Sequence, residues 1–356
     1  MTILHIFKSL NRQFAGTDVV VPNHIKAQQS IEIVGCINIA NIKIDGVKKQ
    51  FDYEKEFKLK SLPIPFNKPD IVVFHQIYVP EYIKISKVLR KEKIPYIIVP
   101  HGSLTNEAQK IKRIKKLFGN LLFNPFIKNA KAIQCLSKRE EDTTKWNVPK
   151  FIGTNGWYLP KNKKQTFHTK KITFTYIGRL DWFHKGLDVM LDAFRLLVDS
   201  PYKEKCELHM YGPDYQGSYT QVEQMIAERG LSEVVSLHPA VFGNEKENVL
   251  LTSDVFIQTS RFEGMPMGIL EALSYGLPCL VTVGTTLGEL VERCNAGWVA
   301  ENTVESIAEK LQQVTAERDK WELKSNNARK LIKENFEWDN VAICAIKKYI
   351  HIIEQR

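Results

Sequence analysis

Two glutamates with a spacing that could serve chemistry, Glu263 and Glu271, lie eight residues apart in the segment 253–282, SDVFIQTSRFEGMPMGILEALSYGLPCLVT. The pattern of the segment predicts a buried strand, a polar loop, a short helix and a second strand. Pro266 suits the first position of that helix, because a helix start needs no N–H there, and Gly276 suits its left-handed end. The free N–H groups and the dipole of such a start bind phosphate. The two carboxylates would then flank a diphosphate-bearing ligand and accept hydrogen bonds from its sugar and ribose hydroxyls.

The loop and the first helical turn supply the groups of this anion site. Gly264 and Met265 precede the turn, and the backbone N–H groups of Met267 and Gly268 face the anion position. A random pair of glutamates near a helix start is more often a pair of solvated acids that favour the helix dipole. The residues around the pair must therefore decide between the two interpretations.

The two glutamates and their neighbours resemble the E-x7-E signature of the retaining GT-B glycosyltransferases of family 4, the group 1 sugar transferases. Glu263 and Glu271 are followed by Ala-Leu and then by Gly-Leu-Pro, as in that signature. Upstream, YIGRLD at 176–181 followed by Lys185 is similar to the second donor motif of the family, in which an arginine and a lysine hold the donor diphosphate. The chemistry agrees, since Arg179 offers a planar fork and Lys185 a point charge for phosphate oxygens.

Weaker similarities follow in the order that the family would give: PHGS at 100–103, NG at 155–156, YG at 211–212 and FEW at 336–338. In its first loop the family usually carries a glycine pair, where this chain has Ala15-Gly16. The resemblance implies that His101 lines the sugar side of the cleft. It implies two sets of site residues: Glu263, Arg179, Lys185 and His101 as catalytic, and Gly16, Arg179, Lys185, Gly212, Glu263, Gly264, Met265, Met267, Gly268 and Glu271 as donor-binding.

The length of 356 residues predicts two domains, because one hydrophobic core rarely spans so long a chain. Apolar strands alternate with amphipathic helices, which predicts parallel sheets covered on both faces. The resemblance implies the α/β GT-B architecture, with two Rossmann-like domains facing each other across a cleft. We expect an acceptor domain over 1–160, joined by a C-terminal helix over 338–356, and a nucleotide-sugar donor domain over 161–337. The polar, proline-containing stretch 159–165 is the best linker.

Two histidines, His75 and His101, end or follow apolar runs that read as strands. Ligands gather at the carboxyl ends of parallel strands, so both histidines could line a site. The alternative is a hydrogen-bonded structural histidine, and this alternative is stronger for His75 than for His101.

The net charge of +10 is uneven: residues 1–167 hold 29 Lys and Arg against 13 Asp and Glu, and the remainder holds 21 against 27. The basic segment Lys110–Lys116 begins a predicted helix whose apolar stripe runs from Ile111 to Leu121. Such a helix could rest on an anionic membrane or meet a lipid pyrophosphate acceptor. The helix alone favours a core-packed stripe with a solvated lysine face, and the charge excess brings the two interpretations level. No nucleic-acid module accompanies the charge, so no nucleic acid is expected as a partner.

The six cysteines are scattered without a C-x-x-C pair, which predicts reduced thiols in a cytosolic protein. Residues 1–10 do not make a signal sequence, and no run approaches the roughly 20 apolar residues that span a bilayer. We therefore expect a cytoplasmic protein, with peripheral attachment to the inner face of the cell membrane as the alternative.

No G-x-G occurs, which argues against a dinucleotide fingerprint, and Ser218 stands where a P-loop would need lysine. No D-x-D occurs either, so metal-chelating aspartates are not expected. Arg179, Lys185 and the helix start would take the place of the cation. We expect no metal and no cofactor, with the nucleoside-diphosphate sugar as a co-substrate.

Together these features predict a metal-independent hexosyltransferase, and the resemblance implies retention at the anomeric carbon. It would move a hexose-type sugar from a nucleoside-diphosphate sugar, UDP rather than GDP, to a glycan or lipid-pyrophosphate-linked acceptor. The setting would be bacterial-type synthesis of surface polysaccharide, lipopolysaccharide or capsule. Two alternatives stay open: a GT-B sugar-nucleotide epimerase or phosphorylase, and a catalytically silent partner subunit with the same fold.

Overall fold

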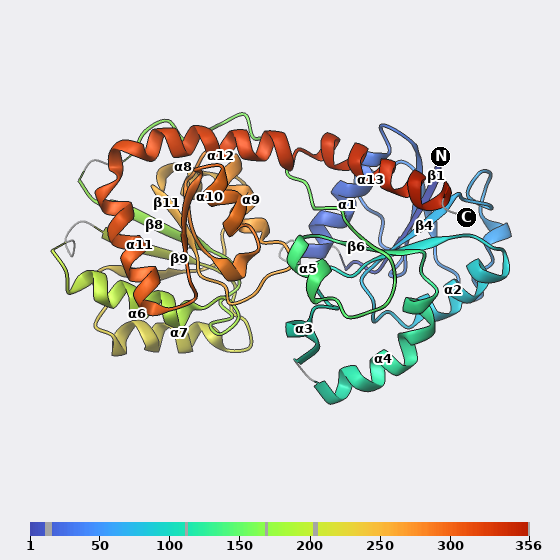
Figure 1. The fold of residues 1–356 in the computed structure, drawn as a ribbon, viewed down its shortest axis with the longest axis horizontal. Helices are drawn as coiled ribbons and strands as arrows, with labels where there is room; N and C mark the ends of the chain where they lie inside the picture. The colour runs from blue at the N-terminus through green and yellow to red at the C-terminus, as the bar shows by residue number, and fades with distance from the viewer. Residues whose placement is uncertain (11–15, 111–112, 168–169, 202–205, 355–356) are drawn as a thin grey trace. The chain divides into compact units, whose positions relative to one another are not determined.

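The computed structural model describes residues 1–10, 16–110, 113–167, 170–201 and 206–354. The chain divides into two compact units (Figure 1). The first unit is Met1–Gly156 together with Glu337–Arg356, and the second is Trp157–Phe336. The chain therefore returns to the first unit after it has completed the second.

The first unit is built on a parallel sheet of seven strands in the order β3-β2-β1-β4-β5-β6-β7. The strands are β1 (Thr2–Phe7), β2 (Ile33–Asn38), β3 (Gln50–Asp52), β4 (Ile71–His75), β5 (Tyr96–Val99), β6 (Ala132–Cys135) and β7 (Lys150–Ile152). The helices are α1 (Gly16–Gln28), α2 (Glu81–Lys91), α3 (Asn106–Lys110), α4 (Arg113–Lys128), α5 (Lys138–Thr143) and α13 (Trp338–Glu354).

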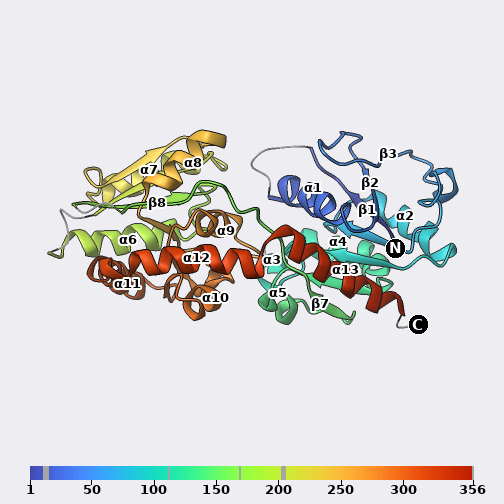
Figure 2. The ribbon, with the colours of Figure 1, turned by 90° about the horizontal axis from the view of Figure 1, so that it is seen from above.

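The two faces of this first sheet differ in character. Successive side chains of a strand point to opposite faces, so Leu4 and Ile6 of β1 join an apolar core with residues of α2 and α4. His5 lies between them in sequence, points to the other face and is fully buried. The helices α1 and α13 pack against each other in this unit (Figure 2). The second face therefore buries polar rings as well as apolar side chains.

The second unit is built on a parallel sheet of six strands in the order β10-β9-β8-β11-β12-β13. The strands are β8 (Ile172–Ile177), β9 (Cys206–Tyr211), β10 (Val235–His238), β11 (Val255–Gln258), β12 (Cys279–Thr282) and β13 (Gly297–Ala300). The helices are α6 (Leu187–Val198), α7 (Ser218–Glu228), α8 (Gly243–Thr252), α9 (Met267–Ser274), α10 (Gly288–Arg293), α11 (Val304–Ala316) and α12 (Trp321–Asn335). One core joins the sheet to α6, α7 and α11, and another joins it to α8, α9, α10 and α12, so both faces are covered as expected.

In both sheets the chain leaves a central strand in two directions. β1 lies between β2 and β4, and β8 lies between β9 and β11. A reversal of this kind opens a crevice at the carboxyl ends of the two neighbouring strands, because the connecting helices leave to opposite faces. In the second unit these ends are followed by Gly178 after β8 and by Thr259 after β11.

The central segment folds as expected, with one shift at the helix start. β11, α9 and β12 reproduce the predicted strand, helix and strand. Pro266 was expected at the first helical position, but it occupies the N-cap with a ψ of 92°, and the helix begins at Met267. Gly276 has a φ of +79°, and the Leu277 N–H donates to the Ala272 carbonyl at 3.0 Å, so the helix ends in the predicted left-handed cap.

Other boundaries in the first unit differ from expectation. β3 and β7, the short strands at the two edges of the sheet, were not predicted. The helix expected from Lys110 is α4, which continues to Lys128. Residues 111–112 of that helix and residues 11–15 of the first loop lie outside the described residues. The six cysteines are free thiols, and none of the described helices is long and apolar enough to cross a bilayer.

Candidate functional site

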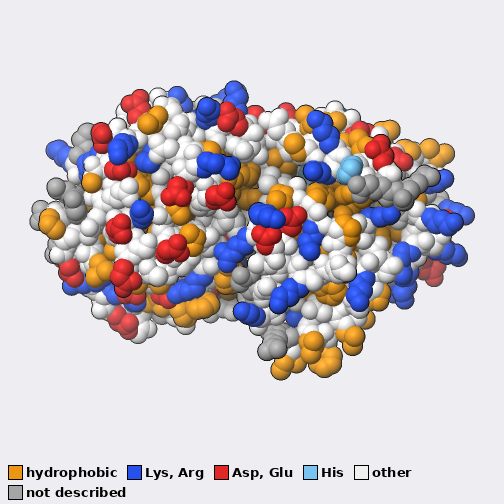
Figure 3. Space-filling model, viewed as in Figure 1, with side chains coloured by type: hydrophobic (Ala, Val, Ile, Leu, Met, Phe, Trp, Pro, Cys, Tyr) orange, Lys and Arg blue, Asp and Glu red, His pale blue; other side chains and the backbone are white. Residues whose placement is uncertain are grey.

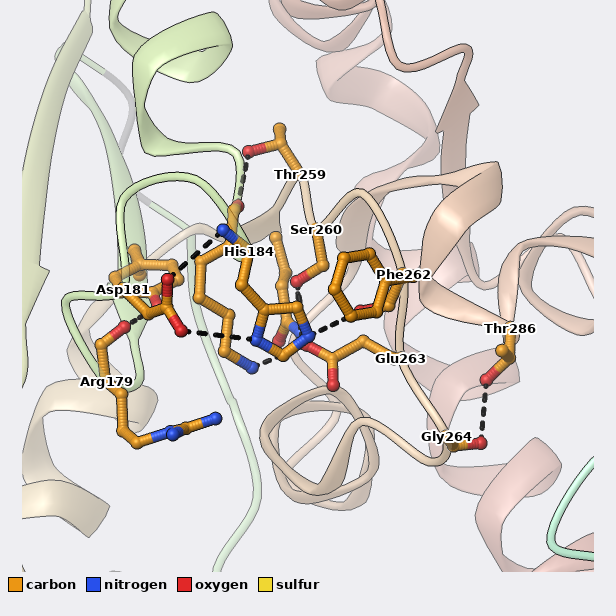
Figure 4. A network of polar contacts seen from close by, with 12 residues as sticks. Arg179, Asp181, His184, Thr259, Ser260, Phe262, Glu263, Gly264 and Thr286 are labelled. Atoms are coloured by element: carbon orange, nitrogen blue, oxygen red, sulfur yellow. Dashed lines mark hydrogen bonds and ion pairs between the residues drawn. The ribbon is translucent and has the colours of Figure 1, made fainter. Parts of the chain in front are cut away.

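The segment that follows β8 carries Arg179. The Tyr176 hydroxyl donates to the Arg179 carbonyl at 2.7 Å, and the Gly178 N–H donates to the Tyr211 carbonyl at 3.0 Å, so this backbone is fixed. The Arg179 guanidinium lies over the ring of Tyr215, 4.8 Å from its centroid. Within the described part of the chain, none of the ion pairs involves Arg179. Figure 4 draws its guanidinium without an interaction to the other residues shown.

Two glycines allow the segments around this site to approach each other. A Cβ atom on Gly212 would lie 1.9 Å from the Gly178 carbonyl oxygen, so the ends of β8 and β9 require glycine here. Gly186 has a φ of +63°, and its Cβ would lie 2.2 Å from the Thr259 carbonyl oxygen. Gly212, which the sequence marks as donor-binding, therefore has a packing role of its own, and Gly186 brings Lys185 beside the loop after β11.

Glu263 is at the centre of the polar network in Figure 4. Its Oε1 accepts from Lys185 Nζ at 2.5 Å, from Ser260 Oγ at 2.8 Å and from Gln258 Nε2 at 3.1 Å. Burial by itself would raise the pKa of this carboxyl, but the charge of Lys185 and the hydrogen bonds from Lys185 and Ser260 outweigh it and hold the pKa below its ordinary value. Glu263 is therefore an anion paired with a cation, and these contacts all use Oε1.

His184 ties the two loops of the site together. Its Nε2–H donates to the Phe262 carbonyl at 2.7 Å, and its backbone N–H donates to Asp181 Oδ1 at 3.2 Å. Burial lowers the pKa of His184, although the Glu263 carboxylate opposes that shift. His184 is therefore a neutral ring that positions both loops, not a third cation of the site.

The first turn of α9 meets the end of β8. A Cβ atom on Gly268 would lie 3.3 Å from the Ile177 carbonyl oxygen, so the turn is almost in contact with the strand. Glu271, one turn further along, forms an ion pair with Lys246 of α8. Burial raises the pKa of Glu271, and the charge of Lys246 opposes that shift. Glu271 is therefore held by a cation of its own unit.

The other predicted donor residues of the second unit lie around the same turn. The Gly264 carbonyl accepts from Thr286 Oγ1 at 3.4 Å. Met265 and Met267 are partly buried against the core beneath α9. All three follow β11 and precede or begin α9, so the structure groups them at the carboxyl end of the second sheet.

The remaining predicted residues, Gly16 and His101, belong to the first unit. His101 follows β5 with a φ of +51°, and its Nε2 lies 3.2 Å from Nδ1 of the fully buried His75. The next N–H, that of Gly102, donates to the buried Glu140 carboxylate at 2.6 Å, which fixes this turn. Gly16 is the first residue of α1, with open space where a side chain would lie.

Sequence reasoning missed Lys246, Ser260 and Gln258 as members of the site. A polar residue at the end of an apolar strand was the available signal for Ser260 and Gln258. Lys246 had no signal, because it precedes Glu271 by 25 positions and reaches it only through the packing of α8 and α9 on one face of the sheet.

The site of the second unit can neutralise an anion. Its positive groups are Arg179, Lys185, Lys246 and the N–H groups that begin α9. Phosphate oxygens are ligands that such groups bind. Across the residues that the structure describes, no group of three or more His, Cys, Asp or Glu side chains could hold a metal ion.

Comparison with known proteins finds a family that the second unit resembles. Residues 160–333 match the model of the family Glycosyl transferases group 1, and this range is nearly the whole second unit. The match to this family therefore lies within the second unit, and it spans just under half of the chain.

Curated relatives are similar over parts of the chain. The UDP-Gal:alpha-D-GlcNAc-diphosphoundecaprenol alpha-1,3-galactosyltransferase of Escherichia coli is 38% identical over 26% of this chain and 24% of its own. The GDP-mannose:cellobiosyl-diphosphopolyprenol alpha-mannosyltransferase of Xanthomonas campestris is 22% identical over 78% of this chain and 77% of its own. The match to the first curated relatives spans less than half of their length.

A solved structure shows the same fold along the whole chain. The sucrose-phosphate synthase of Thermosynechococcus elongatus superposes with a TM-score of 0.76 and 14% identity over 100% of both chains. At this identity the likeness shows the fold alone. The predicted fold class, an α/β GT-B protein with two Rossmann-like parallel sheets, is confirmed.

Proposed function

We propose that this chain is a retaining glycosyltransferase of family 4 that moves a hexose-type sugar from a nucleoside-diphosphate sugar to a glycan or lipid-linked acceptor. The observation that carries the proposal is the Arg179 guanidinium, which lies at the switch point of the second sheet over the Tyr215 ring. Lys185 and the start of α9 lie at the same edge. A half-buried arginine at the same sheet edge as a helix start suits the diphosphate of a nucleotide sugar.

The residues of the second unit divide the work of the reaction. When the bond between the sugar and the diphosphate breaks, the bonding electrons leave with the diphosphate, and Arg179 and Lys185 stabilise that charge. Glu263 accepts hydrogen bonds from sugar hydroxyls through Oε2, and Glu271 accepts from the ribose. Retention by double displacement would need a carboxylate beneath the anomeric carbon, and we assign none. We therefore propose front-face displacement, in which the acceptor hydroxyl attacks from the side of the leaving group and passes its proton to it.

Two ion pairs set a condition on donor binding. Lys185 is paired with Glu263, and Lys246 with Glu271. Phosphate oxygens compete with Glu263 for Lys185, while the carboxylate gains a hydroxyl donor from the sugar. This exchange leaves each buried charge with a partner, which limits its cost in free energy.

The nucleotide and the acceptor are proposed from the relatives. We propose UDP as the nucleotide, because the higher identity of 38% is to the enzyme whose name carries UDP-Gal. Both relatives are named for acceptors on a polyprenyl diphosphate. An acceptor of that kind, in bacterial-type synthesis of lipopolysaccharide or capsule, fits the proposed chemistry.

The first half of α4 offers an apolar surface to such an acceptor. Leu117 and Leu121 are 68% and 74% exposed, and Ile114, Phe118 and Leu122 are exposed beside them. Figure 3 shows hydrophobic side chains gathered at the lower edge, where Figure 1 draws α4. The core-packed alternative for this stripe is therefore wrong for the residues from Ile114 to Leu122, although Phe123, Phe126 and Ile127 further along the helix are buried. Ile111 and Lys112 lie outside the described residues.

An open pocket of about 800 Å³ lies beside α4, and its lining residues suit an acceptor head group. Its lining includes Lys110, Lys128 and Lys145, which suit a diphosphate, and Trp146, which suits the apolar face of a sugar ring. We propose that α4 rests on an anionic membrane surface from the cytoplasmic side while this pocket takes the acceptor head group.

Vesicle sedimentation tests the membrane proposal. Leu117→Ser combined with Leu121→Ser should abolish binding to vesicles that contain phosphatidylglycerol, because the apolar contact is lost. Thermal unfolding should not change, since both side chains are exposed. Leu323→Ser, at an exposed leucine of α12, is the matched control. Equal sedimentation of the double variant and the wild type would contradict the proposal.

Thermal unfolding with UDP, GDP, ADP and CMP in turn tests donor binding. A nucleotide at about 100 times its Kd adds roughly 2.7 kcal/mol to the free energy of unfolding, so UDP should raise Tm. Glu271→Ala should abolish the rise, and Glu334→Ala on the surface of α12 should keep it. If no nucleotide raises Tm of the folded protein, the catalytically silent subunit becomes the better interpretation.

Product analysis separates the remaining alternatives. Turnover in excess EDTA should persist, because the cations of the site are side chains, and a complete loss would contradict metal independence. Release of an epimer or a sugar phosphate without acceptor would favour an epimerase or a phosphorylase over a transferase.

A further inference from the structure

A chain of buried side chains crosses the first unit and ends at His101. At its far end Gln134 Nε2 donates to the Gly153 carbonyl at 3.0 Å, and the Tyr349 hydroxyl lies 2.8 Å from Gln134 Oε1. The Gln28 side chain also faces the Tyr349 hydroxyl and acts to lower its pKa. Gln134, Tyr349 and Gln28 come from β6, α13 and α1, and Gly153 directly follows β7, so the chain exists only because the C-terminal helix packs in this unit.

The near end of the chain consists of imidazoles. Gln28 Nε2 lies 2.8 Å from His24 Nε2, and Gln28 Oε1 lies 2.9 Å from His5 Nε2. His5 Nδ1 lies 2.9 Å from His75 Nε2, and His75 Nδ1 lies 3.2 Å from His101 Nε2. Each link therefore joins one specific nitrogen to the next.

The far end sets the direction of these hydrogen bonds. The Gly153 carbonyl can only accept, so Gln134 turns its amide nitrogen to it and its oxygen to Tyr349. The Tyr349 hydroxyl gives its single proton to that oxygen, so it presents only lone pairs to the Gln28 side chain beside it. The Gln28 amide nitrogen therefore faces Tyr349, and its oxygen is left for His5.

The same order of donor and acceptor continues along the imidazole rings. His5 donates from Nε2 to the Gln28 oxygen, so its Nδ1 carries no proton and accepts from His75 Nε2. By the same rule His75 Nδ1 accepts from His101 Nε2. His24, which accepts from the Gln28 nitrogen at Nε2, carries its proton on Nδ1 instead.

We infer that this chain of hydrogen bonds holds His101 as the tautomer that is protonated on Nε2 and presents a lone pair at Nδ1, with Gln28, Tyr349, His5 and His75 as its positioning residues. Burial lowers the pKa of His5 and of His101 to about 4, so both rings are neutral at pH 7. Each ring therefore has one nitrogen that donates a hydrogen bond and one that accepts. Burial also lowers the pKa of His75 well below its ordinary value.

The tautomer decides what His101 can bind. A neutral ring with a lone pair at Nδ1 accepts a hydrogen bond and cannot donate one there, so it selects a hydroxyl or an N–H of a ligand and not a phosphate oxygen. The step from this to a sugar hydroxyl rests on the proposed function. The assignment of the tautomer itself does not.

NMR of the full chain labelled with ¹⁵N-histidine tests the assignment without any substrate. The ring nitrogens that carry a proton separate from those that do not, and both differ from the nitrogens of an imidazolium. We expect the proton on Nε2 in His5, His75 and His101 and on Nδ1 in His24 at pH 7, each assigned by the loss of its signals in the single His→Gln variant. A proton on Nδ1 of His101, or a charged ring there, would overturn the inference.

The variant Tyr349→Phe tests the positioning role. It removes one hydroxyl and keeps the ring, so the Gln28 amide loses the partner that orients it and both tautomers of His101 become populated. Tyr96→Phe removes a buried hydroxyl that bonds to the Phe126 carbonyl in the same unit, and it should leave the tautomers as in the wild type. Unchanged tautomers in Tyr349→Phe would overturn the role of Tyr349. Because no ligand is added, these outcomes stay readable even if the proposed function fails.

Discussion

The two sheets have the same switch-point topology, but they place opposite chemistry at it. In the first unit, the residues at or near β1 and β4 are neutral imidazoles joined by hydrogen bonds, such as His5 and His75. In the second unit, the segments after β8 and β11 carry charged pairs, such as Lys185 with Glu263. The topology therefore fixes where polar side chains gather, and the local burial and partners decide whether they carry charge.

Net charge alone would have placed the charged site in the first unit and the neutral one in the second. Residues 1–167 have the large excess of Lys and Arg, and the remainder of the chain is acidic in sum. The cations proposed for the donor diphosphate nevertheless lie in the second unit, because they are placed by strand ends and not by composition. A charge surplus describes the surface that a partner meets, and a site depends on single residues.

Arg179 gives the largest test of this contrast. Arg179→Ala should lower kcat by about 100-fold to 1,000-fold while the Kd of the donor changes little, because its charge acts chiefly on the leaving diphosphate. The kcat of Arg179→Lys should lie between that of the wild type and that of Arg179→Ala, since lysine keeps the charge but lacks the planar guanidinium. Steady-state kinetics beside Arg195→Ala, a surface arginine of α6, provide the measurement. An effect confined to KM would contradict the role.

The buried ion pair of Lys185 and Glu263 should make a joint contribution to stability. Glu263→Gln should lower the free energy of unfolding by about 3 kcal/mol, because it leaves Lys185 without its anion in a mostly buried position. Adding Lys185→Met should restore part of that loss. Urea unfolding of the two single variants and the double variant measures the coupling, and strictly additive losses would show that the pair is not an energetic unit.

Mild acid should destabilise the first unit before the second. His5 has a pKa lowered from 6.5 to about 4, so below pH 6.5 the unfolded chain binds a proton that the folded chain refuses. Stability therefore falls as pH drops towards 4, by about 2 kcal/mol from His5 alone at pH 5. Glu263 has a lowered pKa, so its contribution is present above 4.5 and is lost only below that pH.

Urea unfolding at pH 7 and pH 5 measures this difference. His24 has a pKa lowered to about 3 by burial, so His24→Phe should reduce the pH dependence while the new ring still packs on Trp338. His351→Phe, at an exposed position of α13, should leave it unchanged. Equal stability of the wild type at both pH values would contradict the burial of neutral rings.

Substitutions at the predicted donor-binding glycines should have the smallest effects. They show whether a glycine is needed for the packing of the fold. Gly212→Ala should lower the free energy of unfolding by about 1–3 kcal/mol, because its Cβ would meet the Gly178 carbonyl. Gly268→Ala meets only near-contact distances of 3.3 Å and more, and it should change stability by less than about 1 kcal/mol. Thermal unfolding of both variants provides the measurement, and a fully stable Gly212→Ala protein would show that this glycine is not needed for packing.

The sequence by itself determined the fold class and the core of the candidate site. The period of apolar residues predicted most strands and helices of both units, except the short edge strands β3 and β7. The turn chemistry at Gly276 marked the end of α9, because both signals are local properties of the backbone. The spacing of Glu263 and Glu271 and the motif with Arg179 were also visible. Each of these signals lies within one stretch of chain that folds as a unit.

Only the tertiary structure decided which side chains become partners. His5, His75 and Tyr349 are joined because β1 lies next to β4 and because the C-terminal helix packs in the first unit. Lys246 meets Glu271 because α8 and α9 share one face of the second sheet. The exposure of Leu117 was equally hidden, since a periodic apolar stripe looks the same whether or not another element covers it. Partners and burial depend on strand order and packing, and these are set by the whole chain rather than by any local pattern.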